Sequence, residues 1–313
     1  MYTHVIAMKA TRLLLNACCA FTFLVAPPAT LAQDHSSFTF AVLGDLPYFA
    51  WELLRVEQMI ETWNFADLAF VMHVGDIKSG KDLCANQVYV QRKALFERSA
   101  HPFVLLPGDN DWTDCHRQSN GGFDPLERLA YFRSMFYVDE QSLGQRKLAL
   151  ARQSPKLPEN MRWDINGVPF VTIHVTGSHN GYGIAPAMDA EYAARNRDNL
   201  SWLEAAFEAA RDTRAPGLVV AIHGNPRFEA ARGSRAREGY DDFVHALVKQ
   251  ARAFAKPVLF IHGDTHRYRV DRPLADVPNL VRLETFGSPH VGWVRVTVDP
   301  GLAEVFAITP QRN

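Results

Sequence analysis

The sequence has few cysteines and almost no net charge. Of its 313 residues only 4 are cysteine, and 33 lysines and arginines nearly balance 34 aspartates and glutamates, for a formal net charge of −1 at pH 7. This balance gives no electrostatic reason to expect nucleic acid or an anionic membrane as a partner. No C-x-x-C spacing occurs, so the cysteines do not indicate a zinc site.

Other common signatures are also missing. The chain has no internal repeat, low-complexity tract or interdomain linker, and 47% of its residues are hydrophobic. A chain of this length and composition is expected to form one large domain with a substantial core. Ser178 and His179 are adjacent, but no nucleophile elbow accompanies them, so a serine-hydrolase triad is not indicated.

The first 32 residues differ from the rest of the chain. Lys9 and Arg12 precede an apolar run over residues 13–27, and small residues follow it. This is the pattern of a secretory signal, and the run is interrupted by polar and proline residues and is short for a membrane span. We therefore expect residues 1–32 to be a cleaved signal peptide. Residues 33–313 would then form one domain in the periplasm or outside the cell, without membrane attachment.

Two cysteines remain after the expected cleavage, Cys84 and Cys115. An even pair in an exported protein favours a disulfide, with a pair of free thiols as the alternative. Closing that loop would stabilise the fold by roughly 3 kcal/mol in the chain-entropy model.

Five apolar segments, each typical of a buried strand, end in Asp or His beside Gly. The groups are Gly44-Asp45, Gly75-Asp76, Gly108-Asp109-Asn110-Asp111, His223-Gly224 and Gly263-Asp264-Thr265-His266. Helical spacing between them predicts helices over residues 52–63, 87–98, 125–136, 189–211 and 241–254. This alternation favours an α/β domain whose polar groups meet in one cleft at the carboxyl edge of the sheet.

The remaining segments are less regular. Residues 139–160 are polar and lack apolar periodicity, so we interpret them as a solvated surface loop. From residue 280 onward the pattern predicts three short strands, over residues 280–286, 291–298 and 303–308.

The polar groups at the strand ends are typical of a metal site. Carboxylates massed in one cleft raise one another's pKa unless cations neutralise them. A single Gly-Asp after a strand is usually a turn, but five such groups together favour metal ligation. Oxygen and imidazole donors suit Mn, Fe, Zn or Mg, and a pair of such ions can polarise phosphate oxygens and lower the pKa of an attacking water.

The order and spacing of these groups, across residues 38–270, resemble the five sequence blocks of the calcineurin-like metallophosphoesterases, and in particular an uncharacterised bacterial branch. The resemblance implies a four-layer α/β/β/α sandwich with two divalent metal ions at the sheet edge. It also implies hydrolysis of small-molecule phosphate esters by a metal-activated hydroxide. We expect phosphomonoesters to be slightly preferred, with a phosphodiesterase or an inactive metal-binding or ligand-binding protein as alternatives.

The resemblance also suggests which residues bind the metals. It places Asp45 and His266 on one ion, Asp76 as a bridge, and Asp109 or Asn110, His223 and Asp264 on the other. The family's Asp-x-His, Gly-Asn-His and Gly-His-x-His blocks each lose a histidine here, and Tyr48 is close enough in sequence to Asp45 to serve as a substitute. The site is therefore richer in oxygen than is usual, which favours Mn, Fe or Mg over an all-zinc pair.

The residues expected to act on the leaving group are Asn110, Asp111 and His116, with His179 on another loop within reach. Two cations, Lys78 and Arg117, are either phosphate contacts or solvated loop charges. Trp112 either stacks on a substrate or packs against the site wall.

Overall fold

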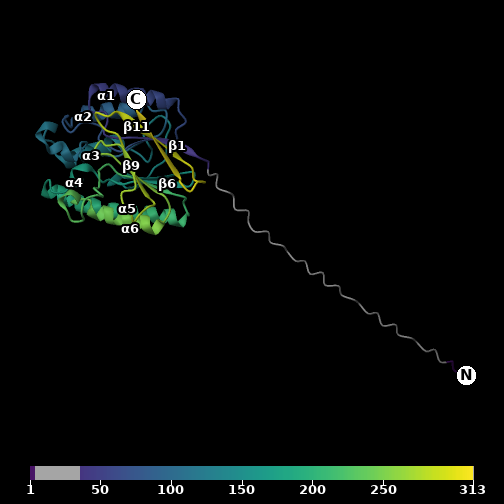
Figure 1. Ribbon diagram of the computed structural model, residues 1–313. Coiled ribbons are helices and arrows are strands. Elements are labelled where there is room, and N and C mark those ends of the chain that lie inside the picture. Colours follow the sequence, from purple (N-terminus) through teal and green to yellow (C-terminus); the bar gives the residue numbers. More distant parts are fainter. Residues whose placement is uncertain (4–35, 313) are drawn as a thin grey trace. The chain divides into compact units, whose positions relative to one another are not determined.

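The computed structural model describes residues 1–3 and 36–312 (Figure 1). The expected signal peptide lies almost entirely outside the described residues, and the account below concerns residues 36–312. Among the described residues, no helix has the length and apolar character needed to cross a membrane.

Two β-sheets form the centre of the fold. The first has five strands in the order β12-β11-β1-β2-β3. Its members are β1 (Phe38–Leu43), β2 (Val71–His73), β3 (Phe103–Leu105), β11 (Gly292–Val298) and β12 (Phe306–Arg312). Strands β1, β2 and β3 are parallel, with Val42 beside Met72 and Met72 beside Val104. Their carboxyl ends therefore meet at one edge.

The second sheet has seven strands in the order β4-β5-β6-β7-β8-β10-β9. Its members are β4 (Ala151–Ser154), β5 (Leu157–Ile165), β6 (Val168–Thr172), β7 (Leu218–Ala221), β8 (Val258–His262), β9 (Arg269–Asp271) and β10 (Leu280–Glu284). Strands β6, β7, β8 and β10 are parallel, while β4, β5 and β9 join antiparallel at the two margins.

The five predicted helices are present in the predicted order, and the short α4 (Gly177–Asn180) was not predicted. The helices are α1 (Ala50–Asn64), α2 (Asn86–Phe96), α3 (Pro125–Phe136), the single turn α4, α5 (Pro186–Asp212) and α6 (Asp241–Phe254). Helix α3 begins as its sequence indicates, because the Asp124 side chain accepts a 2.8 Å hydrogen bond from the Leu126 amide and Pro125 occupies the first turn.

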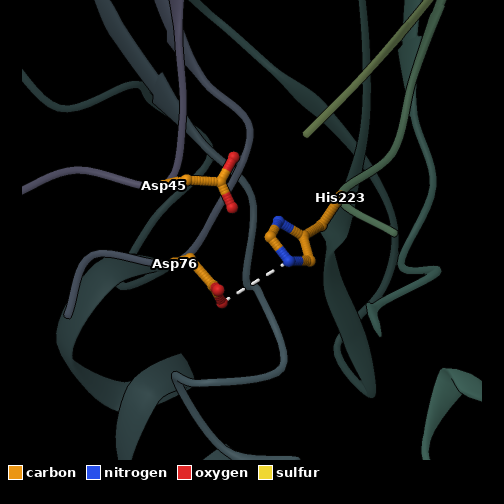
Figure 2. Close-up of side chains that lie close together, drawn as sticks. All are labelled: Asp45, Asp76 and His223. Carbon is orange, nitrogen blue, oxygen red and sulfur yellow. Dashed lines mark ion pairs between the residues drawn. The ribbon is translucent and has the colours of Figure 1, made fainter. Parts of the chain in front are cut away.

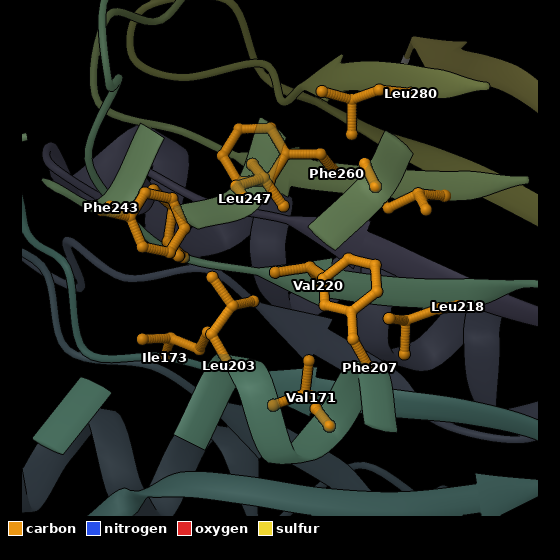
Figure 3. Close-up of a cluster of buried hydrophobic side chains, with 14 of the residues drawn as sticks. Val171, Ile173, Leu203, Phe207, Leu218, Val220, Phe243, Leu247, Phe260 and Leu280 are labelled. Carbon is orange, nitrogen blue, oxygen red and sulfur yellow. The ribbon is translucent and has the colours of Figure 1, made fainter. Parts of the chain in front are cut away.

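Successive side chains of a strand point to opposite faces of its sheet. In each sheet one face packs against the other sheet and the opposite face packs against helices, which defines the layers. Phe40 and Val42 of β1 face the second sheet, whereas Ala41 and Leu43 face the helices α1–α3. On the second sheet, Val171 and Val220 pack against α5 and α6 through residues such as Leu203 and Leu247 (Figure 3). The predicted four-layer α/β/β/α sandwich is therefore confirmed.

The prediction of a solvated loop over residues 139–160 was wrong. Strand β4 and the first half of β5 lie in this range, and the residues from Leu157 to Met161 are buried. The polar Glu159 and Asn160 hide the apolar periodicity, and they are buried because their partners lie far along the chain. Glu159 pairs with Arg133, and Asn160 donates a 2.7 Å hydrogen bond to Asn199.

The C-terminal strands divide between the sheets. Strand β10 belongs to the seven-stranded sheet, whereas β11 and β12 complete the five-stranded one. The last predicted strand, over residues 303–308, occupies Phe306–Arg312 instead, because the turn that precedes it extends further. The sequence prediction missed β9, which has only three residues.

Candidate metal centre

The loops that follow the parallel strands of both sheets meet at one edge of the sandwich. Asp45, Asp76 and Asp109 follow β1, β2 and β3 of the first sheet, whereas His223 and Asp264 follow β7 and β8 of the second. Figure 2 shows Asp45 and Asp76 facing the ring of His223. The strand order of each sheet thus brings together side chains that are more than 200 residues apart in sequence.

These side chains form two groups suited to a metal ion. The first group consists of Asp45, Asp76 and His223, all buried, and the second of Asp109, His223 and Asp264. Within each group the possible ligand atoms lie within 4.8 Å of one another. His223 is common to both, so the two groups are adjacent.

His223 is held in a definite orientation. Its Nδ1 lies 2.9 Å from the Val74 carbonyl oxygen. A carbonyl oxygen only accepts hydrogen bonds, so Nδ1 carries the proton in this contact. Its Nε2 then faces the carboxylates, 2.9 Å from Oδ1 of Asp109 and 3.4 Å from Oδ1 of Asp76. A backbone carbonyl that fixes the remote nitrogen is the usual support of a histidine ligand.

The backbone at this edge is strained. Asp45, Asp76, Asp264 and His266 have φ angles of 55°, 60°, 79° and 59°. Residues other than glycine rarely adopt this left-handed region, and residues held in it often cluster at functional sites. All four belong to the predicted ligand set.

Burial and mutual repulsion set the protonation of the cluster. Burial raises the pKa of Asp45 and Asp76 well above its ordinary value, and burial and Asp109 together raise the pKa of Asp264 to about 6. Burial would also raise the pKa of Asp109, but the hydrogen bond and charge of His223 lower it. Burial opposes a charge on His223, yet Asp76 and Asp109 raise its pKa well above the ordinary value.

The donor set fits divalent cations. Among the described residues, no lysine or arginine forms an ion pair with Asp45, Asp76, Asp109 or Asp264, so an imidazole proton is the main positive charge that the cluster has. The backbone also closes tightly on these oxygens. A Cβ atom at Gly177 would lie 2.4 Å from Oδ1 of Asp109. Oxygen and imidazole donors around uncompensated negative charge suit Mn, Fe, Zn or Mg.

Comparison with known proteins identifies the fold. No protein-family model matches the sequence, and no curated protein is significantly similar to it. Among solved structures, the chain is similar to a dimetal phosphatase from Danio rerio, with a TM-score of 0.51 and 12% identity over 88% of this chain and 98% of that one. The fold is that of the calcineurin-like metallophosphoesterases.

A second similar structure is the purple acid phosphatase PPD1 from yellow lupin, Lupinus luteus. Its TM-score is 0.49 and its identity 14%, over 88% of this chain and 54% of that one. This chain therefore spans about half the length of the lupin structure.

Three further residues that the sequence analysis named, Asn110, Tyr48 and His266, lie beside the carboxylates of the cluster. Asn110 donates a 2.6 Å hydrogen bond from Nδ2 to Oδ2 of Asp76, and the Tyr48 hydroxyl donates to the same oxygen over 2.9 Å. His266 Nε2 lies 3.3 Å from the Tyr48 hydroxyl and 3.5 Å from Oδ1 of Asp45. All seven predicted metal ligands therefore lie at one place, with Tyr48 beside them.

The other residues predicted to act on the leaving group lie elsewhere. The Asp111 carboxylate is fully buried and accepts hydrogen bonds from the amides of Gly108, Asp76 and Ile77, at 2.7, 3.0 and 2.9 Å. It thereby ties the β2 loop to the β3 loop. His116 is exposed and its Nδ1 bonds to the Thr113 carbonyl, so its described contacts do not reach the carboxylates.

The disulfide prediction is confirmed, because Cys84 and Cys115 are bonded. Their pairing joins the loops that carry Asp76 and Asp109. Trp112 is completely buried and packs with other apolar side chains, so it does not stack on a substrate.

The sequence interpretation missed one residue of the cluster, Ser178. Its hydroxyl donates a 2.9 Å hydrogen bond to Oδ2 of Asp109, while the neighbouring His179 is exposed. A signal was present, since residues 176–183 are rich in glycine and follow an apolar segment. They form a sixth loop at the same edge as the other five.

Proposed function

We propose that this protein is an exported, metal-dependent phosphoesterase that acts on small-molecule phosphate esters, with phosphomonoesters slightly preferred. The observation that carries the proposal is the pair of adjacent ligand groups that share His223 at the edge of a metallophosphoesterase fold. Three buried carboxylates and the half-buried Asp264, none with a lysine or arginine partner among the described residues, make a site that cations stabilise.

The proposed ligands would be divided between two ions. Asp45, Asp76 and His266 would hold one ion, and Asp109 or Asn110, His223 and Asp264 would hold the other, with Asp76 within reach of both. Divalent ions at such a site polarise phosphoryl oxygens and increase the acidity of the attacking water. Asp111 would keep the β2 and β3 loops in register through its three amide contacts.

Asn110 and Tyr48 would supply hydrogen-bond donors beside the ester. Burial and the charge of Asp76 raise the pKa of Tyr48 well above its ordinary value, so its hydroxyl keeps its proton at neutral pH. Tyr48 is only half-buried, which leaves it within reach of a substrate. Of the three residues predicted to act on the leaving group, Asn110 is the one that we retain, because its amide lies against Asp76.

The test is hydrolysis of aryl phosphate monoesters and diesters by purified protein. The protein is stripped with a chelator and then supplied with Mn²⁺, Zn²⁺, Fe²⁺ or Mg²⁺ in turn. We expect at least one ion to restore turnover, Asp76→Asn to abolish it, and the exposed control Asp67→Asn to retain it. Failure of every ion to restore turnover, although metal is bound at the site, would overturn the proposal and favour a binding protein.

A further inference from the structure

We propose that Arg117 binds the phosphoryl oxygens of the substrate, and that Asp114 and Ser178 position its guanidinium. This inference rests on the proposed function for its substrate but on separate contacts for its geometry. It concerns a cation that lies outside both ligand groups.

Arg117 reaches the cluster through one side chain. Its Nη2 donates a 3.3 Å hydrogen bond to Oγ of Ser178, which in turn donates over 2.9 Å to Oδ2 of Asp109. The guanidinium therefore lies two hydrogen bonds from a proposed metal ligand. Asp109 is already hydrogen-bonded to Ser178 and His223, so Arg117 does not pair with it directly.

The guanidinium is anchored and still open to solvent. Its Nη1 lies 2.6 Å from Oδ2 of Asp114, whose side chain is 2% exposed, whereas the Arg117 side chain is 46% exposed. Asp114 is itself fixed, since its amide bonds to the Asp109 carbonyl and the adjacent Cys115 forms the disulfide with Cys84. A guanidinium has five N–H donors, so these two bonds leave donors free for phosphate oxygens.

The loop that carries Ser178 is built to hold it there. Ser178, His179 and Asn180 have φ angles of 49°, 55° and 58°, three left-handed residues in succession. Such strain persists only where the surroundings enforce it. Buried Arg195 does so, because it donates hydrogen bonds to the carbonyl of Asn180 over 2.9 Å and to its Oδ1 over 2.5 Å.

The other cation expected near phosphate is not available. Lys78 is buried, and its Nζ donates to the carbonyls of Ser79 and Asp82, at 3.0 and 3.1 Å. Arg227 is exposed near Asp264, and among the described residues its side chain has no hydrogen-bonded anchor. An anchored guanidinium loses less conformational freedom when it binds an oxyanion, which favours Arg117 over Arg227.

The experiment measures inorganic phosphate binding to Mn²⁺-loaded protein by calorimetry, together with kcat and KM for an aryl phosphate. Arg117→Gln is expected to weaken phosphate binding about tenfold and to raise KM by a similar factor. Arg117→Lys should recover part of the loss, because lysine keeps the charge but not the fork of donors. Ser178→Ala should weaken binding about threefold, since Asp114 still holds the guanidinium.

Two matched variants control for charge. Arg232→Gln removes another exposed cation that makes none of these contacts and should leave phosphate binding unchanged, as should Arg227→Gln. Equal binding by Arg117→Gln and the unsubstituted protein would overturn the inference, as would an equal loss in either control. Thermal unfolding at an unchanged midpoint would show that Arg117→Gln is folded.

These measurements distinguish a failure of the Arg117 proposal from a failure of the proposed phosphoesterase activity. Turnover that survives in Arg117→Gln with unchanged KM would overturn the role of Arg117 and leave the phosphoesterase intact. Phosphate binding that depends on Arg117 in a protein without turnover would support the role of Arg117 as an oxyanion contact and overturn the phosphoesterase. A loaded protein that binds no phosphate at all would overturn the role of Arg117.

Discussion

Two largely buried groups of charged side chains in this protein are balanced in opposite ways. The metal-centre cluster contains four carboxylates and His223, and no lysine or arginine among the described residues pairs with it. The second group, which we call the Glu159 group, consists of Glu159, Arg133 and His174. Arg133 lies 2.5 Å from Oε1 of Glu159, and His174 Nδ1 lies 2.6 Å from the same oxygen.

The pKa shifts express this difference. Burial disfavours a charge on Glu159, but His174 and Arg133 together lower its pKa to about 2. Burial lowers the pKa of His174 to about 4, so this imidazole is neutral at pH 7 and donates to the carboxylate. In the metal-centre cluster the pKa values of Asp45 and Asp76 move the other way, well above their ordinary range.

The comparison separates a structural role from a functional one. A buried carboxylate with its own cation and hydrogen bonds is satisfied within the fold, and removing it leaves the partner unpaired. Carboxylates that lie together without a lysine or arginine repel one another although each accepts hydrogen bonds, and perturbed groups of this kind gather at functional sites. We therefore expect the two groups to respond differently to mutation, redox conditions, pH and metal.

The largest effect is expected from Asp76→Asn. Activity should fall by about 100- to 1,000-fold, which is the size of effect expected when one preorganised electrostatic group is removed. The group lost here is a proposed metal ligand. The free energy of unfolding measured in urea with chelator present should not fall, because the substitution relieves repulsion within the cluster. A loss of stability as large as that of Glu159→Gln would contradict the distinction between the two groups.

Removing the disulfide should have the next largest effect. The cysteines are 31 residues apart, and the double variant Cys84→Ser/Cys115→Ser should lose about 3 to 4 kcal/mol of unfolding free energy. Because the bond joins the loops of Asp76 and Asp109, metal affinity should fall as well. A reductant should destabilise the unsubstituted protein but not the double variant, and an equal response of both would refute this.

Glu159→Gln should lower the unfolding free energy by about 3 kcal/mol at pH 7, because the half-buried Arg133 is left without its charged partner. The loss should depend on pH. Folding depresses the Glu159 pKa to about 2, so its stabilisation is complete above the unfolded value near 4.5 and disappears as pH falls toward 2. Urea unfolding between pH 7 and pH 3 measures this. A difference that is independent of pH would show that the charge is not its source.

Metal binding should have the smallest of these effects, and it should act on one group only. A divalent ion at 100 times its dissociation constant should raise the unfolding free energy by about 2.7 kcal/mol. Glu159→Gln should gain the same increment, whereas Asp76→Asn should gain less. Thermal unfolding with and without metal measures both, and a reduced increment in Glu159→Gln would show that the groups are coupled.

Much of the fold was predictable because it depends on local patterns. Apolar runs that end in Gly-Asp or His-Gly mark the parallel strands, and amphipathic segments mark the helices between them. The error over residues 139–160 has a physical cause. Glu159 is polar in sequence but buried in the structure, since Arg133 balances its charge and His174 donates a hydrogen bond to it, and these partners are 26 and 15 residues away.

The candidate site also has a part that was predictable from the sequence and a part that was not. Parallel strands bring their carboxyl ends to one edge, so the convergence of Asp45, Asp76 and His223 follows from where each lies relative to its strand. Asp111 and Ser178 could not be placed by that rule. Asp111 follows a strand closely but turns to backbone amides, whereas Ser178 turns toward Asp109 because its strained backbone directs it there.

The sequence by itself determined the order of most strands and helices, the kinds of ligand at the strand ends and which two cysteines could pair. These depend on periodicity, residue chemistry and position relative to a strand, all of which are local. Only the tertiary structure decided that His223 lies against both sets of carboxylates, that Glu159 has its own cation and that Arg117 is anchored by Asp114 beside the cluster. Each of these depends on how the two sheets and their loops pack, because charges interact over a few ångströms of space whatever their separation along the chain.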